Sequence, residues 1–189
     1  FETDAFLKDA WSTVVFDSKW HKGVVGIVAS RLIEQHYRPT IVLTESNGKV
    51  AGSARSVKGF NVHDAIAACA GLLEQFGGHM YAAGLTMKPE NVTAFRAQFE
   101  AVVRQTLPAA LRIPEEEVDL EIGLEEIQPA FVKGIEAMAP FGPANMKPVF
   151  LTRGVVARDA RTIGNGGDHL KFRITDPANT NVQLEAIAF

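Results

Sequence analysis

The sequence predicts an α/β domain, a mixed sheet with flanking helices, followed by a small, mainly β domain of the OB type. Two patterns predict the first domain: strand, helix and strand follow one another from residue 12, and an Asn-Gly pair then indicates a hairpin. A third predicts the second domain, because strand-like segments separated by Gly, Asn and Asp follow a stretch of prolines and acids at 108–117. We therefore expect domains at 1–113 and 114–189, the second incomplete.

The first elements predict a βαβ unit. Residues 12–17 are apolar and β-branched, as in a strand, and residues 24–36 carry apolar side chains at helical spacing, so we expect a well-buried helix. A second apolar strand at 40–44 is then parallel to the first, through a right-handed crossover. Residues 1–10 are amphipathic, like the end of a helix, and because the chain starts at Phe1 we expect a longer protein.

The Asn47-Gly48 pair is a strong hairpin signal, so residues 49–53 are expected to run back antiparallel to the second strand. The other elements of this domain follow from periodicity and capping residues. They are a helix at 62–75 with Asn61 as its N-cap, a strand at 82–87, and a helix opened by Pro89 and Asn91 with Phe95, Phe99, Val102 and Val103 toward the core.

The second domain begins with an alternating strand and a short helix whose proline lies in the first turn. A loop rich in glycine and proline then leads into an antiparallel meander, as in a small barrel or an incomplete OB fold. The expected segments are a strand at 118–122, a helix at 129–138, a loop at 139–148, and strands at 149–158, 169–175 and 181–189.

Composition limits the possible functions. The 19 basic and 22 acidic residues give a net charge of −3, which excludes a strongly basic, histone-like binder but allows a local basic groove. The single cysteine, Cys69, lies in an apolar helical pattern and is expected to be buried; a chain without a disulfide framework fits a reducing cytoplasm. Apolar runs fall short of the roughly 20 residues of a membrane span, so we expect no membrane partner.

A short polar segment after the hairpin strand has the residue types that bind phosphate. Gly52, Ser53, Arg55 and Ser56 lie within five residues. Arginine offers a planar fork of donors, and serine hydroxyls with freed backbone amides add shorter hydrogen bonds. The alternative is a polar loop whose arginine pairs with a surface carboxylate.

The stretch 76–84 is a second candidate binding segment. Its composition predicts a glycine turn that holds one histidine at the edge of a sheet. Gly77 and Gly78 allow close approach of a ligand, and His79 follows at once. His79 has three possible roles: a phosphate contact, a metal ligand or a cap on a carbonyl; a metal site is disfavoured because further ligands at suitable spacing are missing. His21 precedes a helix start, where anions bind, or is an exposed loop residue.

Several kinds of catalytic machinery are missing from the sequence. It has no closely spaced carboxylate pair or Asp-His cluster for two metal ions, no P-loop, no nucleophile elbow and no Cys-x-x-Cys. We expect no metal site in this chain. The residues suffice to bind a phosphate but not to hydrolyse a phosphodiester.

Four stretches in order resemble DHH-type phosphoesterases. GGH at 77–79 with AAG at 82–84 resembles their DHH-associated domain. Three more narrow the resemblance to the RecJ family of single-stranded-DNA-specific exonucleases, the last of them resembling the start of its OB-type domain. They are WHKGVVGIVASRL at 20–32 with Arg38-Pro39, GSARS at 52–56, and PFGPAN at 140–145 with PVF at 148–150.

The resemblance implies a 5′→3′ exonuclease acting on single-stranded DNA in repair and recombination, with other repair proteins as further partners. Its catalytic DHH domain, with two Mn²⁺ or Mg²⁺ ions, would precede Phe1, so this chain alone is expected to be inactive. The DHH-associated domain would hold the substrate. The implied contacts are Ser53, Arg55 and Ser56 to a terminal phosphate, His79 with the amides of Gly77 and Gly78 near the scissile bond, and His21 more weakly.

Two positions depart from the family pattern, which usually has glycine at Ala54 and Ala144. Alanine costs roughly 1 kcal/mol wherever the backbone needs a positive φ. Two other functions stay open: a DHH-type oligonucleotide or cyclic-dinucleotide phosphodiesterase, which commonly ends after the associated domain, and a non-catalytic interaction module that binds nucleic acid or protein.

Overall fold

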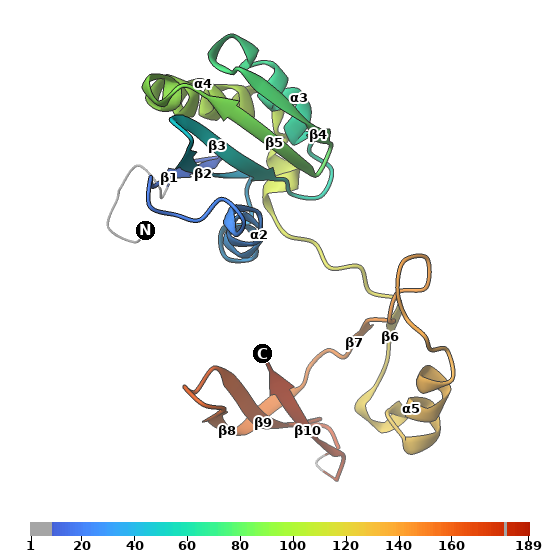
Figure 1. Cartoon of the computed structure of the whole chain (residues 1–189). Coiled ribbons are helices and arrows are strands. Elements are labelled where there is room, and N and C mark those ends of the chain that lie inside the picture. Colours follow the sequence, from blue (N-terminus) through green and yellow to red (C-terminus); the bar gives the residue numbers. More distant parts are fainter. Residues whose placement is uncertain (1–8, 180) are drawn as a thin grey trace. The chain divides into compact units, whose positions relative to one another are not determined.

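The computed structural model describes residues 9–179 and 181–189, which form two compact units (Figure 1). The first ends at Pro114 and the second begins at Glu115. Most of the helical segment expected at 1–10 lies outside the described residues. Within them, no helix has both the length and the apolar character needed to cross a bilayer.

The first unit contains a five-stranded mixed sheet in the order β1-β2-β3-β5-β4. β1 and β2 are parallel and the other neighbours are antiparallel, which confirms the predicted βαβ unit. The predicted hairpin is also confirmed, because Asn47 and Gly48 both have positive φ, 55° and 73°. The strands are β1 (Thr13–Phe16), β2 (Thr40–Ser46), β3 (Lys49–Arg55), β4 (Gln75–His79) and β5 (Ala82–Met87).

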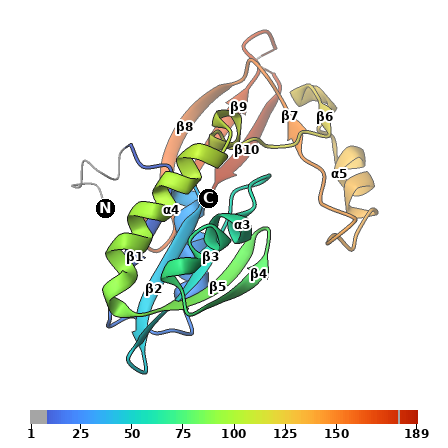
Figure 2. The same cartoon turned by 90° about the horizontal axis from the view of Figure 1, so that it is seen from above.

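Helices cover the two faces of this sheet unequally. α3 (Val62–Ala67) and α4 (Val92–Thr106) lie on one face, where the fully buried Phe95 and Phe99 of α4 fill the main core as predicted (Figures 1 and 2). α2 (Val25–His36) lies on the other face, against β2 and β3. It buries only Val25 and Ala29 fully, so the prediction of a well-buried helix was wrong.

The segment expected as one long helix at 62–75 is shorter, and the glycine turn after it is a strand. α3 ends at Ala67, a 3₁₀ turn covers Ala70–Leu72, and Gln75–His79 forms β4 at the sheet edge. Asn61 is the N-cap as predicted. Strand pairing overrides the helical pattern because β4 supplies hydrogen-bond partners to β5, which begin where the Glu74 amide donates to the Thr86 carbonyl.

A buried carboxylate ties the chain before β1 to α4. Glu100 accepts hydrogen bonds from the amides of Trp11 and Ser12 and from the Ser12 hydroxyl at 2.5–2.9 Å, and it pairs with Arg104 at 2.7 Å. Burial alone would raise the pKa of Glu100, but the hydrogen bonds and Arg104 outweigh it and lower the pKa. The carboxylate therefore stays ionised and fixes the entry to the sheet.

The second unit contains the predicted antiparallel meander, in the order β10-β9-β8. The strand expected at 118–122 shrinks to two residues, and the one expected at 149–158 is interrupted at Gly154, whose φ is +69°. The elements are β6 (Leu120–Glu121), α5 (Pro129–Glu136), β7 (Phe150–Leu151), β8 (Val156–Ile163), β9 (His169–Thr175) and β10 (Gln183–Ala188).

Glycine substitutions at Ala144 and Ala54 should have opposite effects on stability. Ala144 has a φ of +68°, so Ala144→Gly is expected to raise the free energy of unfolding by about 0.5–1 kcal/mol. Ala54 lies fully buried within β3, so Ala54→Gly should lower it by about 1 kcal/mol. Urea unfolding followed by circular dichroism checks both; a destabilising Ala144→Gly would contradict the argument.

Candidate functional site

The strand register brings the two candidate half-sites together. Arg55 on β3 and His79 on β4 are both paired with Ala82 of β5, one on each side of it. Residues paired across a sheet point to the same face, so both side chains lie on one face, about 10 Å apart at the backbone. This is the face on which α2 packs over β2 and β3.

Arg55 and Ser53 form a hydrogen-bonded pair on this face. Arg55 Nη1 donates to Ser53 Oγ and to the Ala54 carbonyl, each at 2.9 Å. The Ser53 oxygen accepts from arginine, so its own proton remains available to an incoming acceptor. Both side chains are partly buried, which holds the guanidinium in one orientation.

The N-terminus of α2 lies beside this pair. A Cβ on Gly26 would stand 3.0 Å from Arg55 Nη2 and 3.2 Å from Ser53 Oγ, so glycine permits the close approach. Among the described residues, no side chain caps the N-terminus of α2 at Val24. Uncapped amides at a helix start attract anions, and here they lie next to a guanidinium and a hydroxyl.

The two candidate histidines are held in the same way. His79 Nδ1 accepts from the Tyr81 amide at 3.4 Å, and His21 Nδ1 accepts from the Gly23 amide at 3.1 Å. In the neutral imidazole the proton then resides on Nε2, which becomes a donor. Both side chains are exposed, so both donors can reach a ligand. His21 lies in the loop before α2, not in the Arg55 row.

The three candidate glycines differ in what they do. Gly52 faces the main core, where a Cβ would overlap the Leu43 side chain, so it serves packing. Gly78 has a φ of +148°, and a Cβ there would overlap the Ala82 carbonyl oxygen. Gly77 has open space at the same position. Gly77 alone of the three therefore leaves room on the Arg55 and His79 face.

The hydroxyl of Ser56, predicted to contact a phosphate, already has a partner. It donates to the Phe60 carbonyl at 2.7 Å, and the Ser56 amide donates to the Tyr81 carbonyl at 3.1 Å. Both bonds shape the turn after β3. Ser56 thus supports the loop that carries Arg55, and the donors available to an anion are those of Ser53, Arg55 and His79.

Two family models match the chain, one over each unit. The DHHA1 domain model matches residues 9–105, about half of the chain. The chain belongs to the DHHA1 family. The RecJ OB domain model matches residues 118–189 and so covers the second unit. The DHHA1 unit carries all the candidate site residues, and the predicted α/β and OB-type fold is confirmed.

Relatives and solved structures agree with the two models. The single-stranded-DNA-specific exonuclease RecJ of Bacillus subtilis is 40% identical over 183 residues, or 96% of this chain and 23% of the relative. The RecJ of Thermus thermophilus is 34% identical over 88% of this chain and 24% of its own length. The resemblance to RecJ is confirmed, and the chain spans about a quarter of the length of these relatives.

Two crystal structures of Thermus thermophilus RecJ are similar to the chain. One, a complex with Mn²⁺, has a TM-score of 0.74 and 30% identity, and the match covers 94% of this chain and 25% of that one. The other, a complex with Mg²⁺, has a TM-score of 0.70 and 31% identity over 94% and 26%. Divalent ions thus accompany the RecJ structures that the DHHA1 and RecJ OB units match.

Sequence reasoning missed several residues of this face in the DHHA1 unit. Gly26 was hidden in an apolar helix, and its role depends on how α2 packs against β3. Gly84, Thr86 and Gln75 share the open face, but only the pairing of β4 with β5 shows it. Recognising residues 75–79 as a strand would have revealed them, since alternation then assigns their faces.

Proposed function

We propose that this chain is the substrate-binding portion of a single-stranded-DNA-specific 5′→3′ exonuclease, an enzyme of DNA repair and recombination that hydrolyses phosphodiester bonds. One observation carries the proposal: Arg55, Ser53 and His79 lie on one sheet face beside the uncapped start of α2. In the part of the chain that the structure describes, Arg55 bonds to Ser53 and the Ala54 carbonyl and His79 to the Tyr81 amide, so this group of donors contains no carboxylate. Such a set suits a phosphate.

The donors divide into two groups along the sheet. Arg55, Ser53 and the α2 amides would hold the terminal phosphate, with the guanidinium neutralising its charge. His79, with the Gly77 and Gly78 amides, would contact the phosphate nearer the scissile bond. His79 donates from Nε2 and stabilises the charge that develops there.

The donor set does not fit a metal ion. Arg55 is a cation, and within the described residues no group of three His, Cys, Asp or Glu side chains is placed to hold one. Mn²⁺ or Mg²⁺ would therefore be held by a DHH domain outside this chain, where such ions polarise a phosphodiester and activate water. This chain's part is to hold the substrate against that centre.

The RecJ OB match over residues 118–189 favours the exonuclease over the other two functions considered. A phosphodiesterase that ends after the associated domain lacks such a unit. A non-catalytic module that uses the second unit alone leaves the donor set in the first unit without a role. Other repair proteins as partners and a cytoplasmic location belong to the same proposal, whose DNA substrate follows the name of the Bacillus subtilis relative, a single-stranded-DNA-specific exonuclease.

Binding of a 5′-phosphorylated oligonucleotide tests the proposal. The chain should bind single-stranded DNA with a 5′-phosphate about tenfold more tightly than the same strand with a 5′-hydroxyl, a difference of about 1.4 kcal/mol. It should release no nucleotides with Mn²⁺ or Mg²⁺ added. Fluorescence anisotropy and gel analysis of one preparation measure both. Equal affinities would overturn the phosphate site, and nuclease activity would overturn the separate metal domain.

A further inference from the structure

The face that carries Arg55 and His79 has three successive rows of paired residues across β3, β5 and β4. The first row is Arg55, Ala82 and His79. The second, two residues along each strand, is Ser53, Gly84 and Gly77, and the third is Ala51, Thr86 and Gln75. Polar side chains thus flank a middle row in which two adjacent positions have no side chain at all.

The fold does not require glycine at either of these two positions. A Cβ on Gly77 would have nothing within 4 Å, and a Cβ on Gly84 would meet only the Gly52 carbonyl, at 3.9 Å. Neither is among the residues with positive φ. Gly52 and Gly78, by contrast, are needed for packing. Glycine that a strand does not need marks a place where a ligand or another backbone approaches closely.

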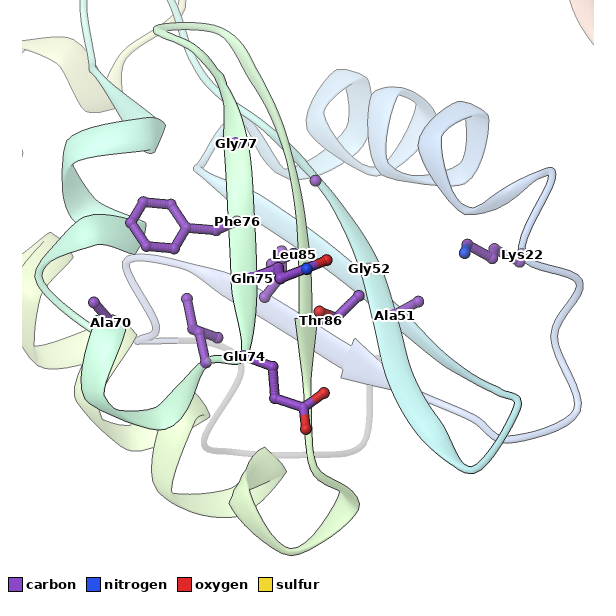
Figure 3. Close-up of a pocket in the computed structure, with 12 residues that line it drawn as sticks. Lys22, Ala51, Gly52, Ala70, Glu74, Gln75, Phe76, Gly77, Leu85 and Thr86 are labelled. Atoms are coloured by element: carbon purple, nitrogen blue, oxygen red, sulfur yellow. The ribbon is translucent and has the colours of Figure 1, made fainter.

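A cavity of about 790 Å³ lies over the glycine pair of the second row and over the third row, and it extends past the edge strand to Ala70 and Leu73. Gly84 of β5 lines it. Gly77, Thr86 and Gln75 line it from the sheet as well, and Lys22 lines it from the loop before α2 (Figure 3). That loop is held over β2 by a hydrogen bond of 2.6 Å from the Thr44 hydroxyl to the Trp20 carbonyl. The glycine pair therefore forms part of the floor of this cavity and is exposed to solvent.

We infer that a nucleobase lies flat on the peptide planes of Gly77 and Gly84. The inference rests on the proposed function, because Arg55 of the first row, with Ser53 at the near end of the second, would hold the phosphate of the same nucleotide. Rows lie about 7 Å apart along a strand, which leaves room for the sugar between phosphate and base. Thr86 and Gln75 offer a hydroxyl and an amide to the edge of the base, and both groups donate and accept hydrogen bonds.

Nuclear magnetic resonance with two small ligands tests the inference. Thymidine 5′-monophosphate and 2-deoxyribose 5-phosphate differ in the base alone, and each is titrated into the 189-residue chain labelled with ¹⁵N and ¹³C. Both should shift the amides of Ser53 and Arg55. Only the nucleotide should move the amide and α protons of Gly77 and Gly84 upfield, through its ring current, and it should bind about tenfold more tightly.

The outcomes separate this inference from the proposed function. Equal effects of both ligands at Gly77 and Gly84, with equal affinity, overturn the base subsite and leave the phosphate site standing. Ring-current shifts at the glycines without changes at Ser53 and Arg55 overturn the phosphate site instead. The absence of binding by either ligand at millimolar concentration overturns both.

Gly77→Val is the matching variant. A strand at a sheet edge with open space accepts valine, so the melting temperature should stay the same or rise. The variant should lose the preference for thymidine 5′-monophosphate over 2-deoxyribose 5-phosphate, because the valine side chain occupies the place of the base. Arg55→Ala should weaken both ligands by the same factor. A Gly77→Val protein that keeps the preference contradicts a base on this floor.

Discussion

Arg55→Ala in a full-length enzyme carrying this chain is expected to lower kcat/KM on 5′-phosphorylated single-stranded DNA by about 10–100-fold, roughly 1.4–2.8 kcal/mol. The guanidinium is held by Ser53 and the Ala54 carbonyl and faces the start of α2, so its loss removes a fixed charge. Arg55→Lys should restore only part of the activity, because lysine keeps the charge but loses the planar fork. Steady-state kinetics measure both variants.

Arg31→Ala is the matched control for this prediction. Arg31 also belongs to the first unit, but its side chain is 75% exposed and pairs with Glu34 on the same helix. Its loss should leave kcat/KM within about a factor of two, as for other surface ion pairs. If the Arg55→Ala enzyme had the same kcat/KM as the Arg31→Ala control, Arg55 would be a polar loop residue that does not contact the substrate.

Gly78→Ala is expected to lower the free energy of unfolding by about 3 kcal/mol. At a φ of +148° a side chain costs about 1–3 kcal/mol, and the Cβ would also overlap the Ala82 carbonyl oxygen and the Ala83 backbone. β4 would have to separate from β5 to relieve the overlap. Urea denaturation of the 189-residue chain measures the loss.

The neighbouring glycine supplies the control for Gly78→Ala. A Cβ on Gly77 meets nothing within 4 Å, so Gly77→Ala should change the free energy of unfolding by less than about 0.5 kcal/mol. Equal losses for the two variants would mean that the cost at Gly78 does not come from its positive φ and its contact with the Ala82 carbonyl oxygen. Such a result would remove the distinction between packing glycines and ligand-facing glycines.

Local signals in the sequence predicted most of the first unit. The Asn47-Gly48 pair placed the β2–β3 hairpin, and Asn61 marked the start of α3. The resemblance to a known family also directed attention to Arg55 and His79. That both residues pair with Ala82 was beyond the sequence, because register emerges only when β4 is recognised as a strand.

Tertiary packing determines three features that local sequence patterns do not: where α3 ends, what Gly26 contacts, and which partner the Ser56 hydroxyl has. Apolar residues at 62–75 do have helical spacing, but residues 75–79 pair with β5 as the strand β4, and the helix ends before them. Gly26 resembles any small residue in an apolar helix until α2 is packed against Arg55. Ser56 has the right chemistry for a phosphate, but the turn after β3 uses its hydroxyl.

The glycine pair of β4 and β5 bears on how an exonuclease treats DNA of any sequence. An enzyme that removes nucleotides in succession meets four bases of two sizes, and a pocket of side chains would fit some better than others. A floor of backbone has no side chain with which to choose, while every base has a flat face to lay on it. With the base on this floor, the two absent methyl groups leave a surface that accepts each base alike, and Thr86 and Gln75, which both donate and accept hydrogen bonds, can meet any base edge.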